Sequence, residues 1–235
     1  MPTKPLSGKA YGSIGHMPGS RTGSSDWTIH AGQFRIGTEK ARDKRDRIIV
    51  TEKLDGSCCA VANVEGVTVA LNRAGYLATS SPYELHHMFA EWVAQNAERF
   101  AMLPIGARMV GEWLAVAHGT RYILPGEPFV PFDVMRGKER YPHDAARILF
   151  SAAGLPGAAV LHDGGPLPLE DALARLGRYG LHGAQDDAEG VVYRVERDGA
   201  CDFLMKYVRP GKVDGKYLPE ISGQPALVLW PAVPA

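Results

Sequence analysis

A lysine followed by an aspartate and a glycine, in Lys53-Leu54-Asp55-Gly56, carries the clearest chemistry in this chain. The apolar run Ile48-Ile49-Val50 before it predicts a strand, and Asp55-Gly56 is typical of a tight turn. A lysine at the end of a strand is held rigidly. Its amine becomes a nucleophile when desolvation or neighbouring positive charge lowers its pKa. Because most lysines are solvated surface groups, the assignment depends on the rest of the chain.

Five further short patterns follow Lys53 along the chain. They are Leu71-Asn72-Arg73-Ala74-Gly75, Gly111-Glu112-Trp113-Leu114, Pro131-Phe132-Asp133-Val134, Glu189-Gly190-Val191-Val192-Tyr193-Arg194 and Phe203-Leu204-Met205-Lys206-Tyr207. Their order and spacing, together with Lys53-Leu54-Asp55-Gly56, resemble motifs I, Ia, III, IIIa, IV and V of the covalent nucleotidyltransferase superfamily, which contains polynucleotide ligases and mRNA capping enzymes. The resemblance covers residues 47 to 209, and its specificity lies in the joint order of the motifs.

Within the superfamily, Ser57 after Asp55-Gly56 and the compact spacing look most like the RNA ligase 2-like family. The resemblance implies an ATP-dependent RNA ligase that seals 5′-phosphate and 3′-hydroxyl ends through a covalent lysine–AMP intermediate. In the family mechanism, the lysine attacks the α-phosphorus of ATP and releases pyrophosphate. The AMP then passes to the 5′-phosphate, and the 3′-hydroxyl attacks and expels it.

The resemblance also implies a role for each nucleotide-binding residue. Glu52 is expected beside the adenine, and Asp55 is expected to shape the turn after the nucleophile Lys53. The arginine that matches Arg73 meets the nucleotide or the 5′-phosphate, which suits a planar guanidinium. Glu112 is expected to bind the ribose hydroxyls, and Phe132 is expected to stack on the adenine.

The last two motifs imply a metal site and a phosphate contact. Glu189 is expected to hold a divalent cation, Mg²⁺ or Mn²⁺, and Lys206 is expected to contact the α-phosphate. Lys53, Arg73 and Lys206 are thus the expected catalytic residues, and all three also bind the nucleotide together with Glu189. The chain departs from the family pattern at position 208, where Val replaces a second lysine. Arg209 and Lys212 stay open as substitutes.

Other interpretations stand beside this one. Glu52 also fits a solvent-facing strand residue, and Phe132 also fits an ordinary core residue. The chain could be a DNA nick ligase, a GTP-using capping enzyme or an inactive nucleotide- or RNA-binding module. The joint presence of Lys53, Glu112 and Lys206 with Glu189 argues against the inactive module.

The composition indicates a globular protein with no global signature of nucleic-acid binding. The chain has 235 residues and is 45% hydrophobic, and its 26 basic residues balance 26 acidic ones. No apolar stretch is long enough to span a membrane, and the N-terminus lacks a signal core, so a cytoplasmic enzyme is expected. Cys58, Cys59 and Cys201 form neither a disulfide framework nor a zinc spacing.

Two regions are expected from the order of composition and motifs. Residues 1–46 form a partly irregular N-terminal extension that begins with Gly, Ser and Pro, and residues 47–235 form the nucleotidyltransferase domain. Residues 35–47 carry a surplus of positive charge, which suggests a solvated face or an RNA contact. Only 29 residues follow Lys206, so no C-terminal OB-fold is expected. An end-processing kinase or phosphatase is a further expected partner.

The element pattern predicts an α+β protein. Its antiparallel β-sheets with flanking helices match a nucleotidyltransferase (adenylyltransferase) domain of the ATP-grasp-like ligase type. Ser81, Pro82 and Glu84 predict a helix start with Ser81 as N-cap, followed by an apolar stripe to Val93. Further helices are expected near residues 144–153 and 169–177. Strands are expected at 58–64, 67–71, 109–115, 129–135, 189–196 and 201–208.

Overall fold

The computed structural model describes residues 4–230, which form two compact units. The Lys53 unit contains Ser13–Asp55, Ala117–Pro125 and the chain from Ala158 onward. The Glu112 unit contains the chain up to Gly12, Gly56–Val116 and Gly126–Gly157. The chain passes from the first unit to the second between Asp55 and Gly56, two residues after Lys53. The boundary predicted at residue 46 stays a prediction, and the two units follow other bounds.

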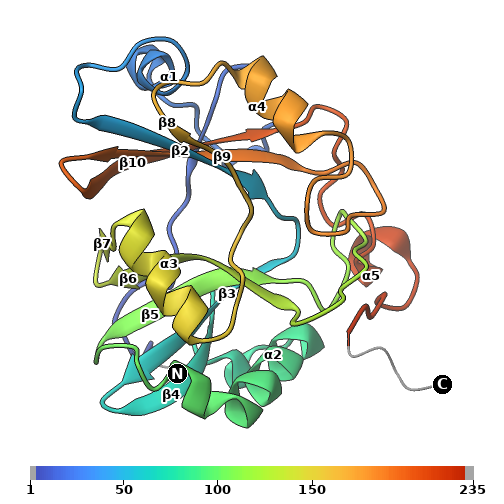
Figure 1. Cartoon of the computed structure of the whole chain (residues 1–235). Coiled ribbons are helices and arrows are strands. Elements are labelled where there is room, and N and C mark those ends of the chain that lie inside the picture. The colour runs from blue at the N-terminus through green and yellow to red at the C-terminus, as the bar shows by residue number, and fades with distance from the viewer. Residues whose placement is uncertain (1–3, 231–235) are drawn as a thin grey trace. The chain divides into compact units, whose positions relative to one another are not determined.

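One five-stranded sheet forms the centre of the Lys53 unit. All its neighbouring strands are antiparallel except the short first strand, which runs parallel to the last. The strand pairing joins segments from distant parts of the sequence (Figure 1). The order across the sheet is β1 (Gly15–His16), β10 (Ala200–Val208), β9 (Gly190–Arg197), β2 (Asp46–Lys53) and β8 (Val160–Gly164).

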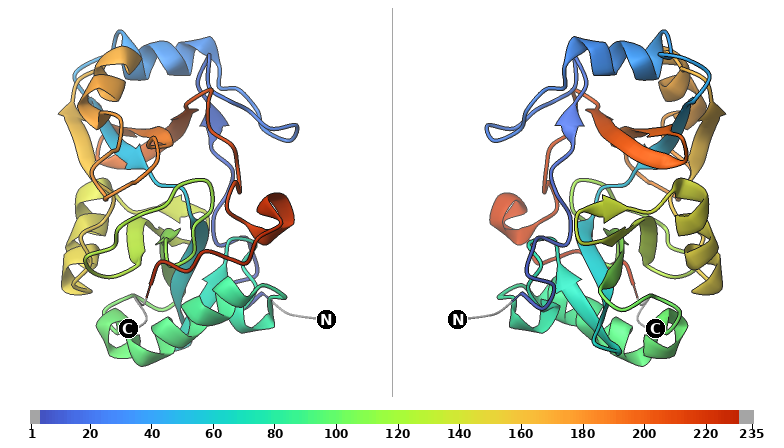
Figure 2. Two further views of the ribbon diagram at one scale, coloured as in Figure 1. Left: turned by 90° about the vertical axis from the view of Figure 1, so that its right-hand side faces the viewer. Right: turned by 90° about the vertical axis from the view of Figure 1, so that its left-hand side faces the viewer.

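Two helices, α1 (Ala31–Thr38) and α4 (Leu169–Leu176), cover one face of this sheet side by side (Figures 1 and 2). The core between them and the sheet contains Val50, Tyr193 and Met205, which lie opposite one another on neighbouring strands. Side chains alternate between the two faces of a strand. Lys53 and Lys206 therefore lie on the face that points away from these helices.

A second five-stranded sheet forms the Glu112 unit, together with α2 (Glu84–Gln95), α3 (His143–Ala152) and short 3-10 turns at Ala78–Ser80 and Ala97–Phe100. Its core is rich in aromatic side chains, among them Phe89, Trp92 and Trp113. These rings pack tightly and bury a large apolar area. The strand order is β4 (Val67–Asn72), β3 (Ser57–Val64), β5 (Ala107–Trp113), β6 (Phe129–Arg136) and β7 (Glu139–Arg140).

The predicted α+β class with mainly antiparallel sheets and flanking helices is confirmed. The predicted strands and helices are present within two residues of their expected bounds. One detail differs: α2 begins at Glu84 with Tyr83 as N-cap, because the Ser81 hydroxyl accepts the Tyr83 N–H instead of a helical one. The sequence did not predict β1 or β8. Residues 209–230, the last described, contain the short helix α5 (Pro219–Ser222) and no strand.

Among residues 4–230, no helix has the length and hydrophobicity needed to cross a membrane. None of the three cysteines forms a disulfide, and Cys59 is fully buried.

Candidate active site

The nucleophile expected from the sequence, Lys53, forms an ion pair with the expected metal ligand, Glu189. The Lys53 Nζ lies 2.6 Å from Glu189 Oε2 at the end of β2. Burial raises the pKa of Glu189, and the positive charge of Lys53 partly offsets that rise. Gly190, directly after Glu189, lies opposite Lys53, and a side chain there would collide with the Tyr207 carbonyl oxygen. The glycine thus allows β9 and β10 to approach each other closely next to the Lys53–Glu189 ion pair.

Lys206 lies on the same face of the sheet as Lys53. It is opposite Val192 in β9, and Val192 is opposite Thr51, two residues before Lys53. Residues opposite each other, and residues two apart on one strand, share a face. The Asp26 carboxylate lies 3.9 Å from Lys206 Nζ. The structure therefore brings together three of the expected site residues, Lys53, Glu189 and Lys206, in one unit.

The turn after Lys53 is anchored by a distant loop. Asp55 accepts hydrogen bonds from the Gly119 N–H at 3.2 Å and from the Thr120 hydroxyl at 3.0 Å. Its own N–H donates to the Tyr122 hydroxyl at 3.0 Å. Lys212 Nζ lies 3.4 Å from the same carboxylate. Asp55 thus connects the turn after Lys53 to residues 119–122.

The two candidates for the absent second motif V lysine differ in their surroundings. The Lys212 ammonium donates to Thr120 Oγ1 at 2.5 Å and to the carbonyl oxygens of Gly119 and Asp187 at 3.2 and 3.1 Å. An ammonium has three donors, so these partners occupy all of them. Arg209 donates to one backbone carbonyl oxygen at 2.5 Å, and a guanidinium has five donors. Lys212 therefore bonds to groups of the protein itself and holds them in position.

Glu52 is buried on the opposite face of β2 from Lys53. Only 2% of it is exposed, so the alternative of a solvent-facing strand residue is wrong. Its Oε2 accepts the Leu181 N–H at 2.8 Å and lies 2.9 Å from His182 Nδ1. A contact of Glu52 with adenine stays a prediction.

Glu112 contacts the glycine of the Lys53 motif. Its Oε1 accepts the Gly56 N–H at 3.3 Å. A side-chain carbon at Gly56 would lie 2.6 Å from the Trp113 carbonyl oxygen, so this position has room only for glycine. Glu112 thus helps to hold the segment that begins at Gly56, within the Glu112 unit.

Phe132 and Arg73 also belong to the Glu112 unit. The β5–β6 register shifts between Pro131 and Asp133, which leaves Phe132 as the extra residue of a β-bulge. Bulges re-aim side chains near active sites. The Phe132 ring lies 5.1 Å from the Tyr11 ring in an edge arrangement. The Arg73 side chain is exposed, and the nucleotide-binding roles of Phe132 and Arg73 stay predictions.

No group of three or more His, Cys, Asp or Glu residues in the described chain is arranged to hold a metal ion. Glu189 nevertheless suits Mg²⁺ or Mn²⁺, because these ions often take one or two carboxylates and complete their shell with water and substrate phosphates. A buried carboxylate beside the expected nucleophile provides such an oxygen donor.

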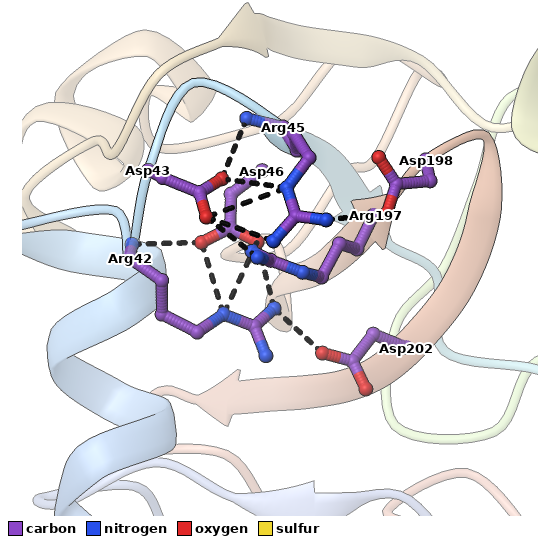
Figure 3. A network of polar contacts seen from close by, with 7 residues as sticks. All are labelled: Arg42, Asp43, Arg45, Asp46, Arg197, Asp198 and Asp202. Carbon is purple, nitrogen blue, oxygen red and sulfur yellow. Dashed lines mark hydrogen bonds and ion pairs between the residues drawn. The ribbon is translucent and has the colours of Figure 1, made fainter.

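The basic segment 35–47 is largely paired with carboxylates. Asp46 accepts hydrogen bonds from Arg42 and Arg197 at 2.7 and 2.8 Å, and Arg45 pairs with Asp43 at 3.1 Å. Burial alone would raise the pKa of Asp46, but the bonds from Arg42 and Arg197 lower it to about 2. Figure 3 shows the network, which comprises Arg42, Asp43, Arg45, Asp46, Arg197, Asp198 and Asp202.

Sequence reasoning missed the residues that surround the expected lysines. His16 and Asp26 lie in the Gly- and Ser-rich segment that was predicted to be a loop, because β1 is too short to show a period. Thr120 carried no motif either, although it is fully buried next to Asp55. The burial of a polar residue such as Thr120 can be seen only in the structure.

A family model described as RNA ligase matches residues 46–208 of this chain. The matched range contains all the expected site residues. No curated protein sequence matches the chain significantly.

Solved structures of ligases share the fold. A Naegleria gruberi RNA ligase with pyrophosphate has a TM-score of 0.54 and 17% identity, over 92% of this chain and 63% of that one. A mutant of that ligase with ATP and Mn has a TM-score of 0.52 and 16% identity, over 83% and 59%. A putative ATP-dependent DNA ligase from Aquifex aeolicus has a TM-score of 0.50 and 16% identity, over 85% and 49%. The chain thus spans about three fifths of the length of the Naegleria gruberi proteins. These structures show a shared fold, and the family match over more than half of its length shows that the chain belongs to the RNA ligase family.

Proposed function

We propose that this chain catalyses ATP-dependent RNA ligation and seals 5′-phosphate and 3′-hydroxyl ends through a Lys53–AMP intermediate. One observation carries the proposal: Lys53 is paired with Glu189 at 2.6 Å and shares a sheet face with Lys206, in a member of the RNA ligase family. The matched Naegleria gruberi structures contain ATP and Mn, or pyrophosphate, which supports the same substrate class here.

In the first step, the Lys53 amine attacks the α-phosphorus of ATP. A nitrogen–phosphorus bond forms, the bond to the bridging oxygen breaks and pyrophosphate leaves. Lys206, on the same face, is suited to neutralise the charge that develops on the α-phosphate. In the second step, a phosphate oxygen of the RNA 5′ end attacks the same phosphorus and Lys53 leaves. In the third, the 3′-hydroxyl attacks the 5′-phosphate and AMP leaves.

Glu189 is the residue proposed to hold a divalent cation. A bound Mg²⁺ or Mn²⁺ would neutralise phosphate charge and would compete with Lys53 for the carboxylate, which favours the neutral, nucleophilic amine. Glu189 thus has two alternative partners, Lys53 and the cation. Asp55 keeps the lysine's turn in place through residues 119–122.

The remaining roles belong to nucleotide recognition. We assign Glu112 to the ribose hydroxyls, Phe132 to the adenine face, Arg73 to phosphate and Glu52 to the adenine edge. The bulge at Phe132 and the exposure of Arg73 support side chains available to a ligand. The hydrogen bonds of Glu52 to Leu181 and His182 support a rigid carboxylate.

The test is covalent labelling. Incubation with α-labelled ATP and Mg²⁺ should leave label on the denatured protein, and Lys53→Ala should abolish it. Equal labelling of Lys53→Ala would overturn the assignment, and labelling by GTP alone would favour a capping enzyme. Matched RNA and DNA nicks would separate RNA ligation from DNA nick sealing.

The chemistry also defines which ends the RNA must carry. Ends with a 5′-hydroxyl or a 3′-phosphate need a kinase or phosphatase first, so such an end-processing enzyme is the proposed partner. RNA with those ends should be sealed only after the partner enzyme is added. A reducing compartment such as the cytoplasm suits three cysteines that form no disulfide.

A further inference from the structure

The N-terminal segment adds a histidine to the sheet face that carries the two lysines. β1 pairs with β10 so that His16 lies opposite Lys206 and Gly15 opposite Met205. Residues opposite each other share a face, so His16, Lys206 and Lys53 belong to one face of the sheet. Met17, the next residue, donates its N–H to the Lys206 carbonyl oxygen at 2.8 Å. Residues 13–17 are thus bonded directly to the motif V strand.

Asp26 links this segment to the Lys206 side chain. Its Oδ2 accepts the Gly23 N–H at 2.8 Å and lies 3.1 Å from His16 Nε2. Its other oxygen, Oδ1, lies 3.9 Å from Lys206 Nζ. The Gly23 hydrogen bond, with the charge of Lys206, lowers the pKa of Asp26, so the carboxylate is charged at neutral pH. One oxygen is therefore held by the segment, and the other faces the lysine.

His16 contacts Oδ2 of Asp26, the carboxylate oxygen that does not face Lys206. It is 2% exposed, and burial followed by the charge of Lys206 lowers its pKa, so the ring is neutral at neutral pH. Its Nδ1 lies 2.7 Å from the Ser20 hydroxyl, which already accepts the Val208 N–H. The Ser20 hydroxyl can donate to Nδ1 or, at 3.3 Å, to the Arg21 carbonyl oxygen. With the proton on Nε2, the contact of this nitrogen with Asp26 is an electrostatic one at 3.1 Å that lacks hydrogen-bond geometry.

We propose that Asp26, oriented by His16, is a positioning residue that places Lys206 for nucleotide transfer, so that residues 13–29 are part of the active site. The inference rests on the proposed function of Lys206. The two lysines on this face are then each paired with a carboxylate before ATP binds, Lys53 with Glu189 and Lys206 with Asp26. The Lys206 pair is the longer one, 3.9 Å against 2.6 Å, which leaves the lysine able to move onto a phosphate.

This arrangement suits the departure at position 208. A chain with one motif V lysine depends more strongly on the orientation of that lysine. A lysine side chain has many rotamers, and ordering it before the reaction reduces the entropy lost in the transition state. Val208 cannot contact phosphate through a charge, but its N–H fixes Ser20, which fixes His16.

The first test is a double-mutant cycle on single-turnover adenylylation. Asp26→Asn should lower the rate at saturating ATP about tenfold, and should leave the ATP concentration for half-maximal rate within about twofold. In a Lys206→Ala background, Asp26→Asn should have no further effect. Asp198→Asn removes an exposed carboxylate from the β9–β10 hairpin and should match the unchanged protein. An unchanged rate in Asp26→Asn, or effects that simply add, would overturn the proposal.

The second test needs no ligase activity. Removing the Asp26 charge favours the neutral amine at Lys206, so limited acetylation followed by mass spectrometry should show Lys206 modified about two- to fivefold faster in Asp26→Asn. His16→Gln should shift Lys206 in the same direction, and the exposed Lys216 should not change. Equal reactivity of Lys206 in all three proteins would overturn the proposal. Failure of ATP labelling in the unchanged protein would instead count against the proposed function alone.

Discussion

Lys53 and Glu189 are each other's charge partner, so a change to one residue alters the electrostatic environment of the other. Glu189→Gln keeps the shape but removes both the partner of Lys53 and the proposed metal ligand. We expect single-turnover adenylylation to fall at least about 100-fold, since a metal at a phosphoryl centre contributes several kcal/mol to the transition state. The measurement is quenched labelling with α-labelled ATP at several Mg²⁺ concentrations. Glu98→Gln, at an exposed glutamate of the Glu112 unit, is the control, and near-normal labelling of Glu189→Gln would make Glu189 an ordinary strand-end carboxylate.

The burial of Lys212 leads to a prediction about the stability of the protein. Lys212→Met removes the cation beside Asp55 and the donor to Thr120 Oγ1, while Asp55 keeps its hydrogen bonds from Gly119 and Thr120. Breaking a buried pair in this way should lower the free energy of unfolding by about 2–4 kcal/mol. Denaturant unfolding measures the change, with the half-exposed Lys216→Met as control. If Lys212→Met were as stable as Lys216→Met but slow in adenylylation, Lys212 would be a phosphate contact.

At the scale of elements, the sequence predicted those with a clear period or a turn signal. The β3–β4 hairpin follows from Glu65-Gly66, and α2 follows from its apolar stripe up to Val93. The predicted start of α2 was two residues too early because Ser81 bonds to Tyr83 outside the helix. β1 has two residues and no period, so its pairing with β10 is decided by tertiary hydrogen bonds.

The same limit applies to the site. Lys53, Glu189 and Lys206 were predicted because short motifs carry them. Strand register then brings them together. A local sequence pattern does not predict the register between strands that are distant in the sequence. The pairing of Asp55 with Thr120, 65 residues away, could not be predicted for the same reason.

The turn between β2 and β3 makes a prediction about backbone space. Gly56→Ala would place a carbon 2.6 Å from the Trp113 carbonyl oxygen and disturb the Glu112 contact. We expect a loss of about 1–3 kcal/mol in unfolding free energy and slower adenylylation, because backbone must move to make room. Thermal unfolding and labelling measure the two effects. Gly126→Ala is the matched control, since no atom lies within 4 Å of its added carbon, and equal behaviour of the two variants would contradict the tight fit.

The start of β2 makes a prediction about pH. The pKa of Asp46 is about 2 in the folded protein, below its usual value, so its stabilisation is present above the unfolded pKa near 4 and is lost as pH falls toward 2. Asp46→Asn should lower the free energy of unfolding at pH 7 by about 2 kcal/mol and should flatten its decline between about pH 4 and pH 2. Denaturant titrations over this range measure it. An unchanged slope in Asp46→Asn would mean that other carboxylates drive acid unfolding.

At the scale of the whole molecule, the charge balance bears on the proposed binding of RNA. The chain has 26 basic and 26 acidic residues, and the network of Figure 3 pairs three arginines with four aspartates. Replacing Arg42, Lys44, Arg45 and Arg47 with Ala would therefore dismantle structural pairs as well as remove positive charge. We expect such a variant to unfold several degrees lower, at about 2–4 °C per kcal/mol lost, and to lose adenylylation and ligation together.

RNA binding itself is better tested with cations outside that network. Lys40 and Lys44 are exposed and lie in the same basic segment, so Lys40→Ala with Lys44→Ala should leave folding and self-adenylylation unchanged. If the segment contacts RNA phosphates, ligation at low salt should fall and its dependence on salt should become shallower, because each lost contact releases about one counterion fewer. Our expectation, from the pairing in Figure 3, is that ligation and its salt slope both stay unchanged. A selective loss of ligation with a shallower slope would instead assign residues 35–47 to the RNA-binding surface.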